Sequence, residues 1–356
     1  MESAVYFIRL ADGAGGETQA EAMTNILLAA DFPALISKRD FVAIKLHVGE
    51  KHNTTHLRPE LAAAAVKVVR QAGGEPFLTD TSTLYRGERE NAIRHCLHAH
   101  AHGFGIENTG APFLPLDGLS GSHEREVEVN GELNRRVKVA GEVFIADALL
   151  SLSHATGHMA SGLGAALKNL GMGLSSRAGK MRQHSSIQPQ VSAKRCANCG
   201  KCRKWCPENA IGEMEGASFI IAEKCIGCGE CIAVCRFSAV KYNYKIESEP
   251  LQKSMVEHAA AVVRHFGDKA MFVNSLMDMT QNCDCITGKQ KKLIPDLGLL
   301  ASPDVVALDQ ATLDLAAGPH GKSLGRSFPG LDPEIQLAHA QKLKLGRRKY
   351  RLVEVP

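Results

Sequence analysis

The sequence predicts an α/β fold with a mostly parallel sheet and flanking helices, interrupted by a small inserted α+β domain. Three observations lead to this prediction. Apolar runs of strand length alternate with segments of helix length in the first half of the chain, and this alternation resumes near its end. Between the two parts lies a segment rich in cysteine. A chain of 356 residues can hold one large domain with an insertion, and we place the parts at 1–187, 188–246 and 247–356.

The first part reads as alternating strands and helices. The run at 41–47 is almost continuously apolar, which is typical of a strand covered on both faces of a sheet. The alanine-rich segment at 59–71 stops at Gly73 and Gly74, as helices commonly do. Strand, helix, strand, helix at this spacing favours a parallel sheet. The expected elements are strands at 4–10, at 41–47 and up to 79–81, and helices at 17–30 and 59–71.

Polar side chains stand where two of these strands end. Lys45 and His47 close one strand, and Asp80 and Thr81 follow the next. In open α/β sheets, such positions line a crevice at the carboxyl ends of the strands. The alternative is that they are ordinary strand-end residues paired with solvent or with one another, because a position in a fold does not by itself establish a function.

Histidines are concentrated in a helix expected at 88–102. His98 and His102 are four residues apart and share a helix face, a spacing that could bind a metal ion. No glutamate motif of the zinc-protease kind accompanies them, and we therefore expect a solvated, histidine-rich helix. The segment contains His95, Cys96, His98, His100 and His102.

The remaining elements of the α/β domain follow the same rhythm. Alternating apolar and polar residues around Asn130 and Gly131 predict a hairpin at 124–139 that extends or flanks the sheet. Ser302 and Pro303 mark a helix start. The other expected elements are strands at 143–152 and 270–274, helices at 251–266, from 303 to about 318 and at 333–345, and a short basic edge strand after 346–351.

A glycine-rich segment follows the strand at 143–152. Six glycines fall from Gly157 to Gly179, which indicates loops and close approach of chain segments. Such a segment can bring backbone N–H groups, lysines and imidazoles around an anionic ligand or cofactor, and we expect it to form the second half of a site. A flexible connector is the alternative. The candidate residues are His154, His158, Lys168, Asn169, Lys180 and His184.

Eight cysteines form two equal runs, each of the form Cys-x2-Cys-x2-Cys-x3-Cys. This spacing lets three thiolates wrap around a cubane cluster and holds the fourth back. In bacterial ferredoxins with two [4Fe–4S] clusters, the fourth ligand comes from the partner run. The sequence therefore predicts two [4Fe–4S] clusters. We assign Cys196, Cys199, Cys202 and Cys235 to cluster one, and Cys225, Cys228, Cys231 and Cys206 to cluster two.

Other interpretations of these runs are weaker. Zinc sites also use Cys-x2-Cys pairs, and secreted chains use disulfide frameworks, but neither explains two runs of identical spacing. Basic residues near the runs would offset the negative charge of the clusters, and they could offer a docking surface to an acidic, soluble electron donor or acceptor protein. These residues are Lys194, Arg195, Lys201, Arg203, Lys204, Lys224 and Arg236.

Cys283 and Cys285 are a close cysteine pair outside the runs, shortly after an expected strand. They could supply a reactive thiol, or they could contribute to a third metal centre completed by histidines or aspartates. Packing as ordinary free cysteines is the alternative, although the polar neighbours Asn282 and Asp284 argue against deep apolar burial.

Charge and hydropathy exclude some classes of protein. The 42 basic and 38 acidic residues give a net charge of +4, which implies no global attraction to nucleic acid. No window reaches the roughly 18 apolar residues of a membrane span, and the N-terminal segment does not read as a signal peptide. We expect a cytoplasmic protein, because thiols that bind iron need a reducing compartment.

Five motifs accompany the cysteine runs, and these are Lys45-x-His47, Asp80-Thr81, Lys168-Asn169-Leu170-Gly171-Met172-Gly173, Asp284-Cys285 and Asp304-Val305-Val306-Ala307-Leu308-Asp309. Together with the runs, they resemble the domain-of-unknown-function family three-six-two, in its iron–sulfur branch. The resemblance covers nearly the whole chain. It implies an α/β domain with a ferredoxin insert and a redox role, and it supplies no substrate. Arg236 departs from the ferredoxin pattern, which usually has proline after this cysteine.

We interpret the chain as an iron–sulfur oxidoreductase whose two clusters pass electrons to a small-molecule substrate or a further cofactor in the α/β domain. A simple electron carrier needs the ferredoxin portion alone, whereas most of this chain lies outside it. Two alternatives stay open: an accessory electron-transfer protein that docks to a larger redox enzyme, and a protein that handles a metal or cofactor. The expected ligand-binding or proton-transferring residues are Lys45, His47, Asp80, His154, His158 and Lys168, with Cys283 and Cys285 nearby.

Overall fold

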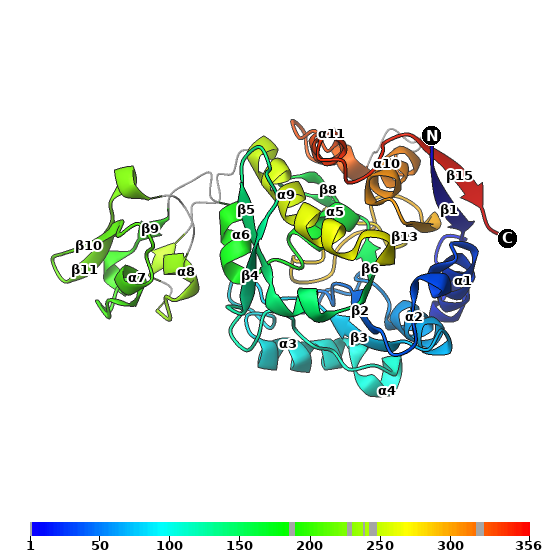
Figure 1. Cartoon of the computed structure of the whole chain (residues 1–356), viewed down its shortest axis with the longest axis horizontal. Helices are drawn as coiled ribbons and strands as arrows, with labels where there is room; N and C mark the ends of the chain where they lie inside the picture. The colour runs from blue at the N-terminus through cyan, green and yellow to red at the C-terminus, as the bar shows by residue number, and fades with distance from the viewer. Residues whose placement is uncertain (1, 185–188, 226–229, 238, 242–247, 318–323) are drawn as a thin grey trace.

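The protein consists of a large α/β body and a smaller unit beside it (Figure 1). The computed structural model describes residues 2–184, 189–225, 230–237, 239–241, 248–317 and 324–356. Within these ranges, no helix combines the length and the apolar character needed to cross a membrane.

The body is built on a seven-stranded sheet. Its strands are β1 (Ser3–Arg9), β2 (Phe41–Lys45), β3 (Glu75–Thr79), β6 (Ala148–His154), β13 (Ala270–Leu276), β14 (Gly298–Ser302) and β15 (Tyr350–Glu354). They follow the order β15-β1-β14-β13-β6-β2-β3. Neighbours pair in parallel except at β14, which runs antiparallel to β1 and β13. The predicted mostly parallel sheet is confirmed, whereas the reversed strand β14 was not predicted.

Helices cover both faces of the sheet. Successive side chains of a strand point to opposite faces, so Leu149 of β6 joins the core under α5, α9 and α10, while Leu150 joins the core under α1 and α2. The near-continuous apolar strands in the sequence follow from this double cover. The helices of the body are α1 (Gly16–Ala29), α2 (Pro59–Gln71), α3 (Ala92–Ala99), α4 (Ile106–Thr109), α5 (Ala166–Gly171), α6 (Arg177–Gln183), α9 (Ser248–Phe266), α10 (Val305–Leu315) and α11 (Glu334–Lys342).

Local signals set two of the helix starts. Pro59 occupies the first turn of α2, where its missing N–H group is not needed. Asp304 caps α10, because its carboxylate accepts hydrogen bonds from the N–H groups of Val306 and Ala307. The predicted start near residue 303 is therefore close, and the predicted end near residue 318 lies outside the described residues.

The region from 124 to 154 differs in part from the prediction. β4 (Glu124–Glu128) and β5 (Arg136–Ala140) form the expected hairpin, with Asn130 at a φ of 49° in its turn, as a separate two-stranded sheet. The expected strand at 143–152 is partly wrong, because Gly141–Ile145 form a 3₁₀ helix and β6 begins at Ala148. Asp147 marks the change, since its carboxylate accepts a hydrogen bond from the Phe41 N–H group just before β6 enters the sheet.

The glycine-rich segment contains regular structure as well as loops. β7 (Thr156–His158) and β8 (Gly162–Gly164) form a small hairpin, and α5 and α6 follow. Its glycines do allow the close approach expected from the sequence. A Cβ atom on Gly171 would overlap the carbonyl oxygen of Met255, and one on Gly179 would overlap that of Lys138. These glycines let α5 and α6 pack directly on neighbouring backbone.

The smaller unit contains the cysteine runs. It has its own small core, which includes Cys202, Ile211, Cys231 and Val240. Two antiparallel strand pairs and two short helices surround this core, and they are β9 (Gln190–Val191) with β12 (Val240–Lys241), β10 (Ile211–Met214) with β11 (Ala217–Ile220), α7 (Lys201–Lys204) and α8 (Glu230–Ala233). The borders predicted at 187/188 and 246/247 lie outside the described residues. We call this unit the insert.

The insert contacts the α/β body through polar groups. Lys138 Nζ of β5 lies 2.5 Å from Glu230 Oε1 at the start of α8. Arg86, in the loop after β3, donates a 3.3 Å hydrogen bond to the carbonyl oxygen of Arg236. Figure 1 shows the consequence, with α8 next to the side of the body formed by α6 and β5.

Candidate functional site

The carboxyl ends of four neighbouring parallel strands, β3, β2, β6 and β13, meet at one edge of the sheet. Such an edge is where open α/β sheets bind ligands. We call the cluster of polar residues there the edge site. It gathers all eight residues proposed from the sequence in the α/β domain, which are Lys45, His47, Asp80, His154, His158, Lys168, Cys283 and Cys285.

Lys45 and Asp80 form a buried ion pair. Lys45 Nζ lies 3.1 Å from Asp80 Oδ1, and the two side chains are 0% and 4% exposed. Burial lowers the pKa of Lys45. Burial also opposes the charge of Asp80, but attraction to Lys45 and other nearby cations outweighs it and holds the pKa of Asp80 well below its ordinary range. The pair therefore joins the ends of β2 and β3. Replacing only one of the two residues would leave the other buried charge without its partner, which is strongly destabilising.

Arg89 carries a second buried positive charge to the edge site. Its guanidinium group lies 3.2 Å from Glu50 Oε2 and 3.5 Å from Asp80 Oδ2, and it donates a 2.5 Å hydrogen bond to the Tyr85 hydroxyl group. Tyr85 in turn donates to Glu50 at 3.1 Å. Glu50, Tyr85 and Arg89 were not predicted from the sequence. The available signal was their position in the loops that follow β2 and β3.

Asn169 of α5 connects the Lys45 pair to β6. Its Oδ1 accepts a 2.6 Å hydrogen bond from Lys45 Nζ, and its Nδ2 donates to Ser151 Oγ and Ser153 Oγ at 3.1 Å each. A Cβ atom on Gly173 would overlap the Lys45 ammonium group. The Lys168–Gly173 motif thus supplies both an amide partner and the space for a buried cation.

Lys180 of α6 faces the end of β3. It donates 2.5 Å hydrogen bonds to Thr81 Oγ1 and to the Ser82 carbonyl oxygen. Burial lowers the pKa of Lys180 to about 8, while burial raises the pKa of Asp117 nearby. A lysine with this pKa can accept or release a proton near neutral pH, which makes Lys180 a candidate acid or base.

Cys285 lies between a cation and a ring N–H group. Its Sγ is 3.5 Å from His47 Nε2 and 4.0 Å from Lys168 Nζ. His47 Nδ1 accepts a 3.0 Å hydrogen bond from the Gly49 N–H group. The neutral His47 ring therefore carries its proton on Nε2, where it is directed at the sulfur.

Cys283 shares a hydrogen bond with Cys285. That bond, together with Lys168 and His47, outweighs burial and holds the pKa of Cys285 well below its ordinary value. The same bond and burial raise the pKa of Cys283 well above its ordinary value. Burial opposes the charge of Lys168, but the two cysteines attract it and raise its pKa. Cys285 is thus the thiolate of the pair, and Cys283 is the thiol.

Asp284 and His154 hold the cysteine turn in place. Asp284 Oδ2 lies 2.8 Å from His154 Nδ1, and the other ring nitrogen, Nε2, lies 2.8 Å from the Met277 carbonyl oxygen. Burial opposes the charge of His154, but attraction to Asp284 outweighs it, so the pKa of His154 is raised. With acceptors at both nitrogens, His154 fixes the turn between Cys283 and Cys285.

Two further imidazoles stand near Cys285. Burial lowers the pKa of His158 to about 3 and that of His184 to about 4, so both rings are neutral at pH 7. His158 Nδ1 accepts a hydrogen bond from Ser161 N at 3.1 Å, and Ser161 Oγ lies 2.8 Å from the same nitrogen. Its proton is therefore on Nε2.

The histidine-rich helix is buried on one face only, so the prediction of a solvated helix was wrong for His95 and His98 but not for His100, whose side chain is 66% exposed. His95 and His98 are 0% and 7% exposed. His98 Nε2 lies 3.1 Å from the Gly49 carbonyl oxygen, and His102 Nδ1 lies 2.8 Å from that of Val48. These rings support the loop after β2, a contact between segments distant in sequence. Among the described residues, no third metal ligand joins His98 and His102.

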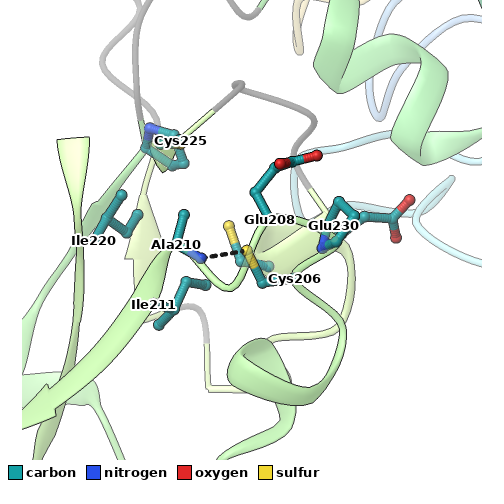
Figure 2. Close-up of a pocket in the computed structure, with 10 residues that line it drawn as sticks. Cys206, Glu208, Ala210, Ile211, Ile220, Cys225 and Glu230 are labelled. Atoms are coloured by element: carbon teal, nitrogen blue, oxygen red, sulfur yellow. Dashed lines mark hydrogen bonds between the residues drawn. The ribbon is translucent and has the colours of Figure 1, made fainter. Parts of the chain in front are cut away.

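The insert contains two small cavities lined by cysteines. Their empty volumes are about 320 and 330 Å³, and both values include space that is open to solvent. Figure 2 shows the first of them. The cysteines that line the cavities are Cys206, Cys225 and Cys231 for the first, and Cys196, Cys199, Cys202 and Cys235 for the second. These sets follow the crossed assignment predicted from the spacing, and Cys228 lies outside the described residues.

Backbone N–H groups point at several of these sulfurs. Ala210 N donates to Cys206 Sγ at 3.1 Å (Figure 2), and Ala239 N donates to Cys235 Sγ at 3.3 Å. In the part of the chain that the structure describes, no three histidine, cysteine or acidic side chains gather as ligands of one metal ion. Each thiolate of a cubane cluster binds a different iron, so its ligands surround a larger space. The cavities and their donors fit a [4Fe–4S] cluster.

The family follows from a comparison with protein-family models. The model described as Domain of unknown function (DUF362) matches residues 42–314. The chain belongs to this family. The match spans most of the α/β body and the whole insert of this DUF362 protein, including every residue named in the edge site.

A comparison with solved structures found matches of low similarity. The lactate racemase apoprotein from Thermoanaerobacterium thermosaccharolyticum is 11% identical, with a TM-score of 0.40 over 77% of this chain and 51% of that chain. A crystal structure of a protein from Thermotoga maritima is 11% identical, with a TM-score of 0.40 over 81% of this chain and 56% of that chain. The DUF362 chain thus spans about half the length of the structures it matches. No curated protein matches the sequence.

Proposed function

We propose that this DUF362 protein is an iron–sulfur oxidoreductase with two [4Fe–4S] clusters in the insert and a substrate or further cofactor at the edge site. The observation that carries the proposal is a shared loop. Tyr85 and Arg89 belong to the edge site, and Arg86 between them contacts the carbonyl of Arg236, the residue after Cys235. The two units therefore meet where one contributes cluster ligands and the other contributes polar, buried side chains.

The cysteines that line the two cavities would hold the clusters, with Cys228 as the expected fourth ligand of the second. When bound, such clusters supply or accept single electrons. The N–H groups of Ala210 and Ala239 would stabilise the ligating sulfurs of Cys206 and Cys235. Exposed lysines near the first run, Lys201 and Lys204, would attract an acidic, soluble electron donor or acceptor.

The edge site would bind the reacting molecule. Buried groups with strongly shifted pKa values concentrate at functional sites, and here they come from segments that are far apart in the chain. Lys180, with a pKa of about 8, is suited to transfer a proton. Lys168 and His47 would orient an anionic group or the Cys285 thiolate. We place this chemistry in the cytoplasm, whose reducing conditions keep free thiols available.

Iron analysis of the protein prepared without oxygen tests the cofactor part of this proposal. We expect about eight irons per chain and the electron paramagnetic resonance signal of reduced cubane clusters. Cys202→Ser should remove about half of the iron. Cys96→Ser is the matched control, because Cys96 lies in α3, far from both runs in sequence, and should leave the iron content unchanged.

A chain without iron or acid-labile sulfide, or an unchanged iron content in Cys202→Ser, would overturn the proposal.

The contact between the units is tested by Arg86→Ala. We expect slower electron delivery to the edge site in this variant with an unchanged iron content, because the change removes the hydrogen bond to Arg236 and no cluster ligand. Equal rates would show that the shared loop has no part in coupling the units.

A further inference from the structure

The cysteine turn at the edge site has the arrangement of a thiol–disulfide exchange centre. We propose that Cys283 and Cys285 form a redox-active dithiol that acts on a small disulfide, with Cys285 as the attacking thiolate and Cys283 as the resolving thiol. The inference deepens the proposed function by naming a substrate class, and it rests on that function for the electrons that reduce the pair again.

The two sulfurs differ in a way that assigns their order of reaction. Cys285 is half-buried and can be reached, while Cys283 is 8% exposed. A single residue, Asp284, separates the two cysteines in one turn. An incoming disulfide would therefore meet Cys285 first, and the mixed disulfide would lie within reach of Cys283.

Charged and titratable groups surround Cys285 from every element packed against it. Lys168 and His47 lie nearest and favour the thiolate. The other groups that face it are Tyr85 and Arg89 in the loop after β3, His158 of β7, His184 at the end of α6, and Cys283 of its own turn. Nucleophilic thiols occur in surroundings of this kind, whereas structural cysteines are buried among apolar groups.

A metal site at the same turn is not supported by the neighbouring donors. Asp284 Oδ2 already pairs with His154 Nδ1 at 2.8 Å, and Asp284 Oδ1 lies 3.5 Å from Asn53 Nδ2. Among the described residues, no three histidine, cysteine or acidic side chains gather there as a set of ligands. We therefore assign thiol–disulfide exchange, and not metal binding, to Cys283 and Cys285.

The exchange runs in two steps. The Cys285 thiolate attacks one sulfur of the substrate R–S–S–R, the substrate S–S bond breaks, and the leaving thiolate takes a proton from solvent. A mixed disulfide now joins Cys285 to R–S. Cys283 then attacks Cys285 Sγ, its proton passes to the second leaving thiolate, and an intramolecular Cys283–Cys285 disulfide forms. The substrate has gained two electrons as two thiols, and two electrons with one proton would restore the Cys285 thiolate and the Cys283 thiol.

Oxidised glutathione is a suitable probe for the full-length protein prepared without oxygen. We expect the wild type to release two glutathione thiols per disulfide consumed and to form the Cys283–Cys285 disulfide, identified by peptide mass spectrometry. Cys283→Ser should stop at the mixed disulfide on Cys285. Cys285→Ser should react at Cys283 at least about tenfold more slowly, because Cys283 is less exposed and burial raises the pKa of its thiol.

A stable mixed disulfide in the wild type, or reaction of Cys283 at the wild-type rate in Cys285→Ser, would overturn the assignment. The iron content of the wild-type protein separates this proposal from the preceding one. If the wild type holds no clusters yet exchange proceeds, the dithiol stands and the iron–sulfur function fails. If the clusters are present and exchange does not occur, the dithiol proposal fails alone.

Alkylation gives an independent measurement that does not depend on any substrate. We expect iodoacetamide to modify Cys285 at a pH where ordinary thiols are protonated, and Lys168→Met to shift the pH profile of that reaction to higher pH, because the variant lacks the cation that favours the thiolate. Lys253→Met is the matched control, since Lys253 pairs with Glu132 on the surface of the body. Equal rates in all three proteins would contradict an activated Cys285.

Discussion

The insert and the edge site place their functional residues in opposite ways. In the insert, the candidate ligands come from two short runs that follow each other in the chain, and each cavity is lined by cysteines of both runs. In the edge site, the contacting groups are far apart in the chain: Lys45 and Asn169 are separated by 124 positions, and His47 and Cys285 by 238. A local pattern defines the first site, whereas the second exists only once the sheet has formed.

The two units also differ in how they are stabilised. The described core of the insert has four buried residues, whereas the body has two large apolar cores on either side of its sheet. A unit with so small a core depends on bound metal or another staple. The body depends on packing and on buried polar pairs. Four experiments test this contrast, in order of decreasing effect.

Removal of iron should unfold the insert and leave the body folded. Metal binding supplies folding free energy where the apolar core is too small to do so. Hydrogen exchange followed by mass spectrometry should show loss of protection in β10 and β11 after chelation, with β6 and β13 unchanged. Retained protection in β10 would mean that the insert folds without metal.

Asp80→Ala should destabilise the body by about 3–5 kcal/mol, because it leaves the buried Lys45 and Arg89 charges without one partner. Urea unfolding provides the measurement. Glu75→Ala is the control, since it removes the exposed Arg39–Glu75 pair, in which the side chains are 81% and 50% exposed. Such a pair contributes about 0–1 kcal/mol. Equal losses in the two variants would contradict the buried network.

Gly171→Ala should cost about 1–3 kcal/mol, because the added methyl group would overlap the Met255 carbonyl and push α5 away from α9. Gly15→Ala is the control, since a Cβ atom there meets no neighbour, and we expect a change within about 0.5 kcal/mol. The free energy of unfolding in urea distinguishes the two. A neutral Gly171→Ala would show that α5 can shift without loss.

The His154–Asp284 pair should make a contribution to stability that depends on pH. The pKa of His154 is raised in the folded protein, so its stabilising effect is complete below about pH 6.5 and fades as the pH rises through the folded value. The difference in unfolding free energy between wild type and His154→Gln should therefore be larger at pH 6 than at pH 9, by roughly 1 kcal/mol. The same difference at both pH values would refute the paired, charged state.

Several elements of the body were predictable because their signals are local. The helix at 59–71 has a proline at its start and glycines after its end, and the hairpin around Asn130 has a turn dipeptide. The strand β14 was not predicted, because its five buried residues show no alternation of polar and apolar side chains. Its antiparallel direction is set by its pairing with β1 and β13. The burial of His95 and His98 was also missed, because it depends on packing against the loop after β2.

The sequence by itself predicts which cysteines belong together, because ligand spacing along the chain is the geometric requirement of a cubane cluster. It also determined the class of the fold, through apolar strands that alternate with helices. The tertiary structure decided which polar residues meet. Only the parallel order of β3, β2, β6 and β13 brings Lys45, Asp80 and Cys285 to one edge. Only there do Cys283, Lys168 and His47 outweigh burial and favour the Cys285 thiolate, while burial lowers the pKa of Lys180 to about 8.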